Sequence, residues 1–436
     1  MNRNSLLCTA AAVAVAIAGC SNEDSVTTQS FEPNLVHAYK YELKEGVPMQ
    51  QVLDDTNWAV QELFGTAESP KLPDLIAEDE DLAAVVHADH LLKGQALYKE
   101  HLCVTCHGAT GNGRGETAAL STPYPRDYRL GVFKFKSTTK NAKPTRDDLA
   151  TIIRGGVSGT MMKALPNLTD EEVDALIDYV VYLSWRGEVE RAMIDDAILE
   201  LDVAGGERII NPAFQGSAVE EEAEVFDEAW EYATDHVVDI AEDWLDAEDE
   251  VVEVELPNDD AIPVPASNAE FREMLDGDQA EVLLASVERG RQLFRGKIAA
   301  CSKCHGNEGK GDGQTTDYDD WTKDWTVRVG LKPEDRDALI PLMARGALPP
   351  KNIHPRNFSE GIFRGGSSPE DLYRRITVGI AGTPMPAVTY VPGEFEEPDV
   401  WHLINFIRSL ETPPEVTADE PTADEPTSPP AATKQT

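Results

Sequence analysis

Two five-residue motifs constrain this chain more than any other feature of its sequence. Residues 103–107 read Cys-Val-Thr-Cys-His, and residues 301–305 read Cys-Ser-Lys-Cys-His. Two thiols three positions apart can add to the two vinyl groups at one edge of a porphyrin, and the adjacent histidine then reaches the iron as proximal ligand. Each motif therefore predicts one covalently attached haem c. The predicted attachment residues are Cys103, Cys106, His107, Cys301, Cys304 and His305.

A zinc site and a thioredoxin-like redox pair are the alternatives for the spacing of these cysteines. Zinc would need further clusters of cysteine or histidine, and we find none in the sequence. The chain has six cysteines, and the two outside the motifs, Cys8 and Cys20, both lie near the N-terminus. The cysteine usage therefore favours haem attachment and leaves no pair for a disulfide.

The N-terminus has the pattern of an export signal. Arg3 supplies a positive charge, and residues 6–18 form an apolar run that is too short to span a bilayer. The segment that ends at Cys20 resembles a bacterial lipobox, which implies cleavage before this cysteine and its lipidation. We therefore expect an exported lipoprotein that is anchored through Cys20 at the periplasmic face of a membrane.

Acidic residues dominate the charge, which is −41 for the whole chain. Residues 188–278 carry thirty acidic side chains against three arginines. This stretch is either a solvated connector, partly helical or disordered, or a surface that steers a redox partner with a basic docking surface. Within it, residues 225–245 have the pattern of an amphipathic helix. Nucleic-acid binding is excluded, because phosphate contacts require a basic face.

An internal repeat organises the rest of the chain. Residues 94–98 precede the first motif as residues 290–294 precede the second, and glycines follow each motif histidine. Further along, Pro125 to Tyr128 matches Pro355 to Phe358. The spacing between the histidine and the matched arginine is longer in the second copy, which predicts an insertion around residues 317–350.

Each copy ends in a predicted helix. In the first copy, Thr169 and Glu172 form a possible capping box before an apolar face that starts at Val173. In the second copy, Pro398 suits the first turn of a helix with the same face. A haem motif between two such helices resembles the class I cytochrome c family. The resemblance implies a mainly α protein of two tandem cytochrome c-like domains, in which the terminal helices cross beside each haem.

The resemblance also suggests the sixth iron ligands. Residues 382–386 read Gly-Thr-Pro-Met-Pro and resemble the distal methionine loop of this family, which implies that Met385 ligates the second iron. The first copy reads Gly-Thr-Met-Met-Lys and places Met162 at the matching position, with Met161 as its rival.

Three further residues are candidates for contacts with the haems. His354 precedes the second Pro-Arg pair and is an alternative ligand or a contact of a haem propionate. Arg126 and Arg356 occupy equivalent positions in the repeat, and their guanidinium groups suit carboxylates. Surface exposure is the alternative for both arginines.

The predicted division of the chain has six parts. They are a lipoprotein signal (1–19), a tether with a short docking segment (20–83), a first cytochrome c domain (84–187), an acidic connector (188–280), a second cytochrome c domain (281–411) and a disordered tail (412–436).

The function expected from this division is a lipid-anchored dihaem cytochrome c that carries single electrons in a respiratory or related redox chain. The alternatives are a dihaem enzyme, such as a peroxidase with one displaceable axial ligand, and a haem subunit of a larger membrane redox complex.

Overall fold

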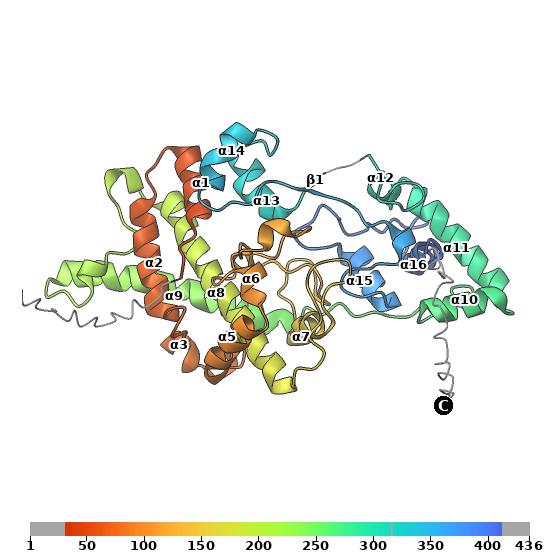
Figure 1. Cartoon of the computed structure of the whole chain (residues 1–436), viewed down its shortest axis with the longest axis horizontal. Coiled ribbons are helices and arrows are strands. Elements are labelled where there is room, and N and C mark those ends of the chain that lie inside the picture. The colour runs from red at the N-terminus through yellow and green to blue at the C-terminus, as the bar shows by residue number, and fades with distance from the viewer. Residues whose placement is uncertain (1–30, 315–316, 412–436) are drawn as a thin grey trace, which may run out of the picture.

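The computed structural model of this protein describes residues 31–314 and 317–411 (Figure 1). Within these ranges the chain is mainly helical and contains two similar halves, which agrees with the expected mainly α fold of two tandem domains. The predicted signal segment, the lipidation site Cys20 and the tail 412–436 lie outside the described residues. Among the helices of the described part, none combines the length and the hydropathy that a membrane span requires.

Nine α-helices form the first half of the described chain. They are α1 (Leu35–Glu45), α2 (Gln50–Phe64), α3 (Asp74–Ala77), α4 (Glu80–Ala83), α5 (Leu91–Glu100), α6 (Cys103–His107), α7 (Arg146–Gly155), α8 (Asp170–Glu200) and α9 (Glu220–Leu245). The described second half contains α10 (Asn268–Asp276), α11 (Ala280–Arg295), α12 (Ser302–His305), α13 (Asp320–Trp325), α14 (Arg336–Met343), α15 (Pro369–Val378) and α16 (Asp399–Ser409). Two short strands, β1 (Asp317–Tyr318) and β2 (Asn352–Ile353), pair antiparallel.

In each copy of the repeat, the helix before the haem motif crosses the helix at the end of the copy. Helix α5 crosses α8 at Gly94, where an added Cβ would collide with the carbonyl oxygen of Ala175. Helix α11 crosses α16 at Gly290, where a Cβ would collide with the carbonyl oxygen of His402. The two backbones touch at each crossing, so the first glycine of each copy is required by packing.

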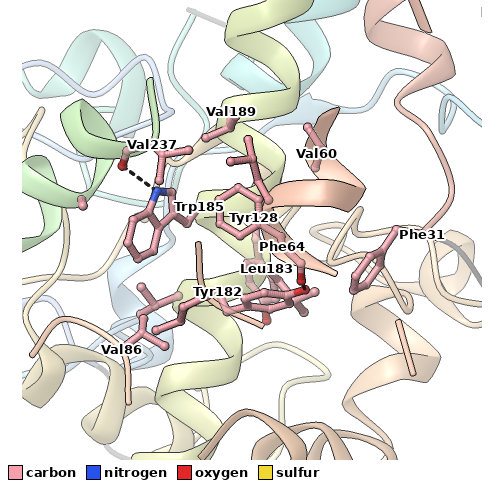
Figure 2. Packing of buried hydrophobic residues seen from close by; sticks show 14 of the residues in the cluster. Phe31, Val60, Phe64, Val86, Tyr128, Tyr182, Leu183, Trp185, Val189 and Val237 are labelled. Carbon is pink, nitrogen blue, oxygen red and sulfur yellow. Dashed lines mark hydrogen bonds between the residues drawn. The ribbon is translucent and has the colours of Figure 1, made fainter. Parts of the chain in front are cut away.

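Helix α8 is longer than the sequence analysis expected. The predicted capping box of Thr169 and Glu172 is present at its start. The helix then continues to Glu200, so the expected domain boundary after residue 187 falls inside it. The extension is stable because its apolar side is buried at Val189, Met193, Ile194 and Ala197. Just before it, Trp185 is fully buried and donates a hydrogen bond to the carbonyl oxygen of Val237 in α9 over 2.9 Å (Figure 2).

The acidic connector is folded where it forms α9. This helix buries one apolar face against the first domain, while its acidic side chains remain largely solvated. Its buried residues are Phe226, Ala233, Val237, Ala241 and Trp244. The amphipathic helix expected over residues 225–245 is therefore present and starts at Glu220, because the apolar stripe outweighs the repulsion among exposed carboxylates.

The segment assigned to a tether is, from residue 31 onward, part of the first domain. Phe31, Val60 and Phe64 lie in the same hydrophobic core as Tyr182 and Trp185 (Figure 2). The hydroxyl of Tyr182 donates to the carbonyl oxygen of Phe64 over 2.7 Å. This correction arises because α2 and α8 bury their apolar faces against each other, a contact between segments more than a hundred residues apart.

The insertion in the second copy is closed off at its base by β1 and β2, in which Asp317 opposes Ile353. Between the strands, α13 and α14 lie beside α1, as Figure 1 shows in cyan and red. They share a small core with α1 that contains Val36, Trp325, Leu339, Leu342 and Ala347. The insertion therefore connects the second copy to α1, the first helix of the described residues.

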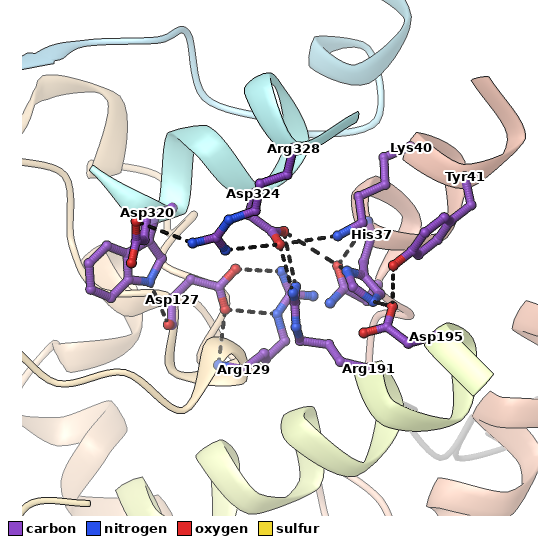
Figure 3. Close-up of polar contacts among 12 residues, drawn as sticks. His37, Lys40, Tyr41, Asp127, Arg129, Arg191, Asp195, Asp320, Asp324 and Arg328 are labelled. Carbon is purple, nitrogen blue, oxygen red and sulfur yellow. Dashed lines mark hydrogen bonds and ion pairs between the residues drawn. The ribbon is translucent and has the colours of Figure 1, made fainter. Parts of the chain in front are cut away.

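A buried polar network supports this junction (Figure 3). Asp324 of α13 accepts from Lys40 of α1 over 3.1 Å and from Arg191 of α8 over 2.9 Å. Next to it, Nε2 of His37 lies 2.6 Å from a carboxylate oxygen of Asp195. Burial alone raises the pKa of Asp324, but Arg191, His37 and Lys40 outweigh it and hold this pKa well below its usual range. The ion pairs of this network thus connect α1, α8 and α13.

Candidate haem-binding sites

Both haem motifs start and end with a reversal of the backbone. In the described part of the chain, Leu102 (φ +61°) and Ala300 (φ +50°) are the non-glycine residues with positive φ, and each directly precedes the first cysteine of a motif. Gly108 and Gly306 follow the histidines with φ of +76° and +74°. The strain at Leu102 and Ala300 recurs at equivalent positions, so the repeat extends to the local backbone of the site.

The motif histidines have the same hydrogen bond. Nδ1 of His107 lies 3.1 Å from the carbonyl oxygen of Arg126, and Nδ1 of His305 lies 3.3 Å from that of Arg356. Since a carbonyl can only accept, Nδ1 carries the proton and Nε2 keeps a free lone pair, which is the form that ligates iron. Burial lowers the pKa of His107 to about 4 and also lowers that of His305, so both imidazoles are neutral at pH 7.

An aromatic ring supports each of these imidazoles. His107 stacks on Tyr128 with ring centroids 4.8 Å apart and an interplanar angle of 13°. His305 stacks on Phe358 at 4.6 Å and 17°. The sequence analysis matched these two positions in the repeat without assigning them a role. The shared signal was an aromatic residue two places after the arginine whose carbonyl oxygen pairs with the histidine.

The four motif cysteines form no disulfide with one another and are partly buried. Burial raises the pKa of Cys103 and of Cys301 to about 11. A redox-active CxxC pair needs a lowered thiol pKa, so these values disfavour the thioredoxin-like alternative. Thioether formation, which needs two accessible thiols beside a histidine with a free Nε2, fits this donor set.

The two predicted distal loops have the same conformation. The amide of Met162 donates to Oγ1 of Thr160 over 3.1 Å, and the amide of Met385 donates to Oγ1 of Thr383 over 3.2 Å. Met162 and Met385 are both half-buried, whereas Met161 is 53% exposed. The loop geometry therefore favours Met162 over Met161 at the first site, and the lysine that replaces proline after Met162 leaves the fold of the loop intact. Ligation of the iron by either methionine remains a prediction.

Arg126 lies half-buried between the two copies, with its guanidinium 3.7 Å from the ring centroid of Trp321. Burial lowers the pKa of Arg126 to about 10 and that of neighbouring Lys134 to about 7. The acid nearest to Lys134 is Asp319, at 3.5 Å. These two cations are thus desolvated without enough carboxylates to compensate them.

Arg356, the counterpart of Arg126, pairs with Glu360 at 2.9 Å. Its Nε and that of Arg364 are buried without a hydrogen-bond partner. Carboxylates of a haem would supply the acceptors that these guanidinium groups lack, so the described residues fit the group. His354 is exposed.

The two copies contact each other reciprocally. A Cβ added to Gly159 in the first distal loop would lie 2.9 Å from Ile362, and one added to Gly382 in the second loop would lie 3.2 Å from Val132. Gly159 and Gly382 are equivalent in the repeat, and so are Val132 and Ile362. The contact is therefore isologous, as in a two-fold dimer, but within one chain.

Residues 91–184 and 287–411 match the cytochrome c family, and together they make up half of the chain. The chain belongs to the cytochrome c family. Its two cytochrome c regions coincide with the two copies described above, and the family attaches haem c covalently and transfers electrons through its iron. This cytochrome c therefore has a haem-based redox function.

One solved structure resembles this cytochrome c over most of its length. It is a chain of the Kuenenia stuttgartiensis reducing HAO-like protein complex Kustc0457/Kustc0458. The two are 22% identical, the match covers 73% of this chain and 96% of that chain, and the TM-score is 0.42. A comparison with curated proteins finds no match.

Proposed function

We propose that this protein is an exported, lipid-anchored dihaem cytochrome c that carries single electrons in a respiratory or related redox chain. Each domain holds one haem through its two cysteines, with His107 and His305 as proximal ligands and Met162 and Met385 as distal ligands. The haem iron supplies the one-electron chemistry by cycling between its ferrous and ferric states. The protein buries the group and orients both imidazoles.

The observation that carries this proposal is the equal geometry of the two sites. A carrier needs both axial positions filled, so that the iron changes its charge with little rearrangement. The histidine Nδ1 is bonded to a carbonyl in both domains, and the two methionine loops have matching hydrogen bonds. A peroxidase needs one site with a displaceable ligand, and this symmetry disfavours that alternative.

The two domains would form one electron-transfer unit. Because each distal loop packs on the other domain, the reciprocal interface favours exchange of electrons between the two haems. We assign Arg126, Lys134, Arg356 and Arg364 as partners of the haem propionates, since these cations lie at or near the interface and lack sufficient acids. This pairing would raise the reduction potential relative to a propionate in water, because it offsets negative charge near the iron.

The test is a redox titration of the holoprotein with optical detection. We expect two one-electron steps and a methionine-to-iron charge-transfer band from both ferric haems, of which Met385→Ala removes one. High-spin ferric iron at either site, together with turnover of peroxide, would support the enzyme alternative instead. A haem content of one per chain would overturn the dihaem assignment.

The lipid anchor at Cys20 and a basic redox partner are parts of the same proposal. We expect the mature protein isolated from cell membranes to begin at a lipidated Cys20, which intact-mass analysis of the N-terminal peptide checks; an unlipidated N-terminus at another residue would contradict the lipoprotein assignment. The exposed carboxylates of α9 would steer a basic redox partner. The association rate should then fall steeply with ionic strength.

A further inference from the structure

A second cluster of ligand-type side chains lies in the first domain and uses none of the predicted haem-binding residues. His87 is the N-cap of the short helix η1 (Ala88–His90), His90 is the last residue of η1, and Asp178 belongs to α8. Nδ1 of His87 lies 3.2 Å from Oδ2 of Asp178, and Nδ1 of His90 lies 2.7 Å from the same oxygen. Each of the three residues offers one ligand atom, a ring nitrogen or a carboxylate oxygen, that lies within 4.8 Å of those of the other two.

A neighbouring arginine orients the carboxylate of this cluster. Nη1 of Arg146 donates to Oδ1 of Asp178 over 2.6 Å and to the carbonyl oxygen of Val85 over 3.2 Å. One oxygen of Asp178 is thereby held by a cation, and the other faces the two imidazoles. Metal-binding sites in proteins commonly have such an outer partner, which fixes the direction of a ligand.

The cluster is open on one side. The side chain of Asp178 is fully buried, whereas that of His90 is 23% exposed and that of His87 is 48% exposed. A cation can therefore enter from solvent, and water can complete its coordination. With bonds of about 2.0–2.1 Å to nitrogen and oxygen, neighbouring ligand atoms lie roughly 3 Å apart, which the distances to Oδ2 already approach.

We propose that His87, His90 and Asp178 bind one divalent transition-metal cation of the class that prefers imidazole, such as Zn²⁺. Two imidazole nitrogens with one carboxylate oxygen favour zinc, copper or nickel over calcium or magnesium. Binding moves the remaining proton of each imidazole to Nε2, which is possible because both rings reach solvent. The bound cation would fasten the segment before α5 to the middle of α8.

Calorimetric titration of the haem-loaded protein with Zn²⁺ near neutral pH tests this site. We expect one saturable Zn²⁺ per chain that excess Ca²⁺ does not displace. His87→Gln and His90→Gln should each weaken binding by at least about tenfold, as expected for loss of a ligand. His236→Gln is the matched control: Nε2 of His236 lies 2.5 Å from Asp196, a histidine–carboxylate pair without a second imidazole, and its loss should leave the affinity unchanged.

Thermal unfolding provides a second measurement. Zn²⁺ should raise the melting temperature of the wild type and of His236→Gln, but not that of His87→Gln, because a ligand stabilises the state that binds it. The haem spectrum of each variant shows whether its domain is folded. The proposal is overturned by equal Zn²⁺ affinity in the wild type and His90→Gln, by no saturable binding to the wild type, or by displacement of Zn²⁺ with Ca²⁺.

Discussion

Each motif imidazole is held from two sides, by a carbonyl oxygen on Nδ1 and by an aromatic ring on its face. The carbonyl belongs to Arg126 at the first site and to Arg356 at the second, so one short segment both orients the histidine and supplies a cation near it. At the scale of residues the two sites are thus near copies. One difference between them is on the distal side, where Lys163 follows Met162 and Pro386 follows Met385.

The choice between two adjacent methionines is a prediction at this scale. Met162→Ala should abolish the charge-transfer band of one ferric haem and lower the potential of that haem, because a thioether ligand raises it. Met161→Ala should leave both the band and the potential unchanged, since Met161 is largely exposed. Optical spectra of the two oxidised variants check this. The reverse result would assign the ligand to Met161.

A second prediction concerns Asp324 in the buried network. Asp324→Asn leaves Lys40 and Arg191 buried without their anion, and breaking such a pair costs about 3–5 kcal/mol. The folded-state pKa of Asp324 lies well below that of the unfolded chain, so its contribution is complete above the unfolded value of about 3.9 and is lost as the pH falls below it.

Urea unfolding of the wild type and Asp324→Asn over a range of pH measures this contribution. The difference in free energy of unfolding should be largest at neutral pH and shrink toward pH ~3. Asp320→Asn is a control, because Asp320 pairs with the half-exposed Arg328 at 3.2 Å and such pairs contribute about 1 kcal/mol or less. Equal losses in free energy of unfolding in Asp324→Asn and Asp320→Asn would mean that the buried network stabilises the protein no more than an exposed ion pair does.

Helices of very different composition build the first domain. Helix α8 crosses α5 near its start and packs against α9 further on, so one long helix joins the haem site to the acidic region. Helix α9 is stable despite its acidic face because its apolar stripe, which includes Phe226, Val237 and Trp244, is buried. The apolar stripe of an element, rather than its net charge, thus decides whether that element folds here.

Glycine at the helix crossings gives a prediction at the scale of elements. Gly94→Ala places a Cβ against the backbone of α8, and such overpacking costs about 1–3 kcal/mol or more. Gly155→Ala at the end of α7 is the control, because nothing lies within 4 Å of its Cβ and its φ is not left-handed. The control should change stability by less than about 1 kcal/mol. Thermal unfolding, followed by the absorbance of the haem, measures the stability of both variants and distinguishes Gly94→Ala from Gly155→Ala.

The described part of the chain is a pair of similar cytochrome c domains that pack against each other. Their reciprocal contact involves both distal loops, and the insertion of the second domain adds Trp321 to it. The indole Nε1 donates to the carbonyl oxygen of Asp127 over 3.0 Å, while Arg126 stacks on the ring. Trp321 has no counterpart in the first domain, so the insertion breaks the two-fold symmetry.

Removing the side chain of Trp321 should uncouple the unfolding of the two domains. Trp321→Ala loses the hydrogen bond to Asp127 and the stacking with Arg126, and we expect one calorimetric unfolding transition to separate into two. The cost should stay below the about 3–5 kcal/mol of a core Trp→Ala, because Trp321 is half-buried. Trp230→Ala, within the first domain, should instead destabilise that domain without separating it from the second. An unchanged single transition in Trp321→Ala would contradict the coupling.

Short-range spacing in the sequence was sufficient for the haem motifs, the repeat, the capping box at Thr169 and the amphipathic pattern of α9. These features depend on covalent neighbours or on residues within one or two helical turns, where the geometry of the chain is known in advance. The equivalence of Met162 and Met385 also followed from the repeat, and the matching loop conformations agree with it.

Long-range contacts decided the rest. The burial of α2 against α8, the pairing of Lys40 with Asp324 and the position of Trp321 between the domains join residues far apart in the sequence. The local pattern does not say which element a helix packs against, nor whether an arginine is exposed, because both depend on residues far away in the sequence. The sequence motifs alone thus predict haem attachment. The association of the two cytochrome c domains into one unit depends on the packing of the folded protein.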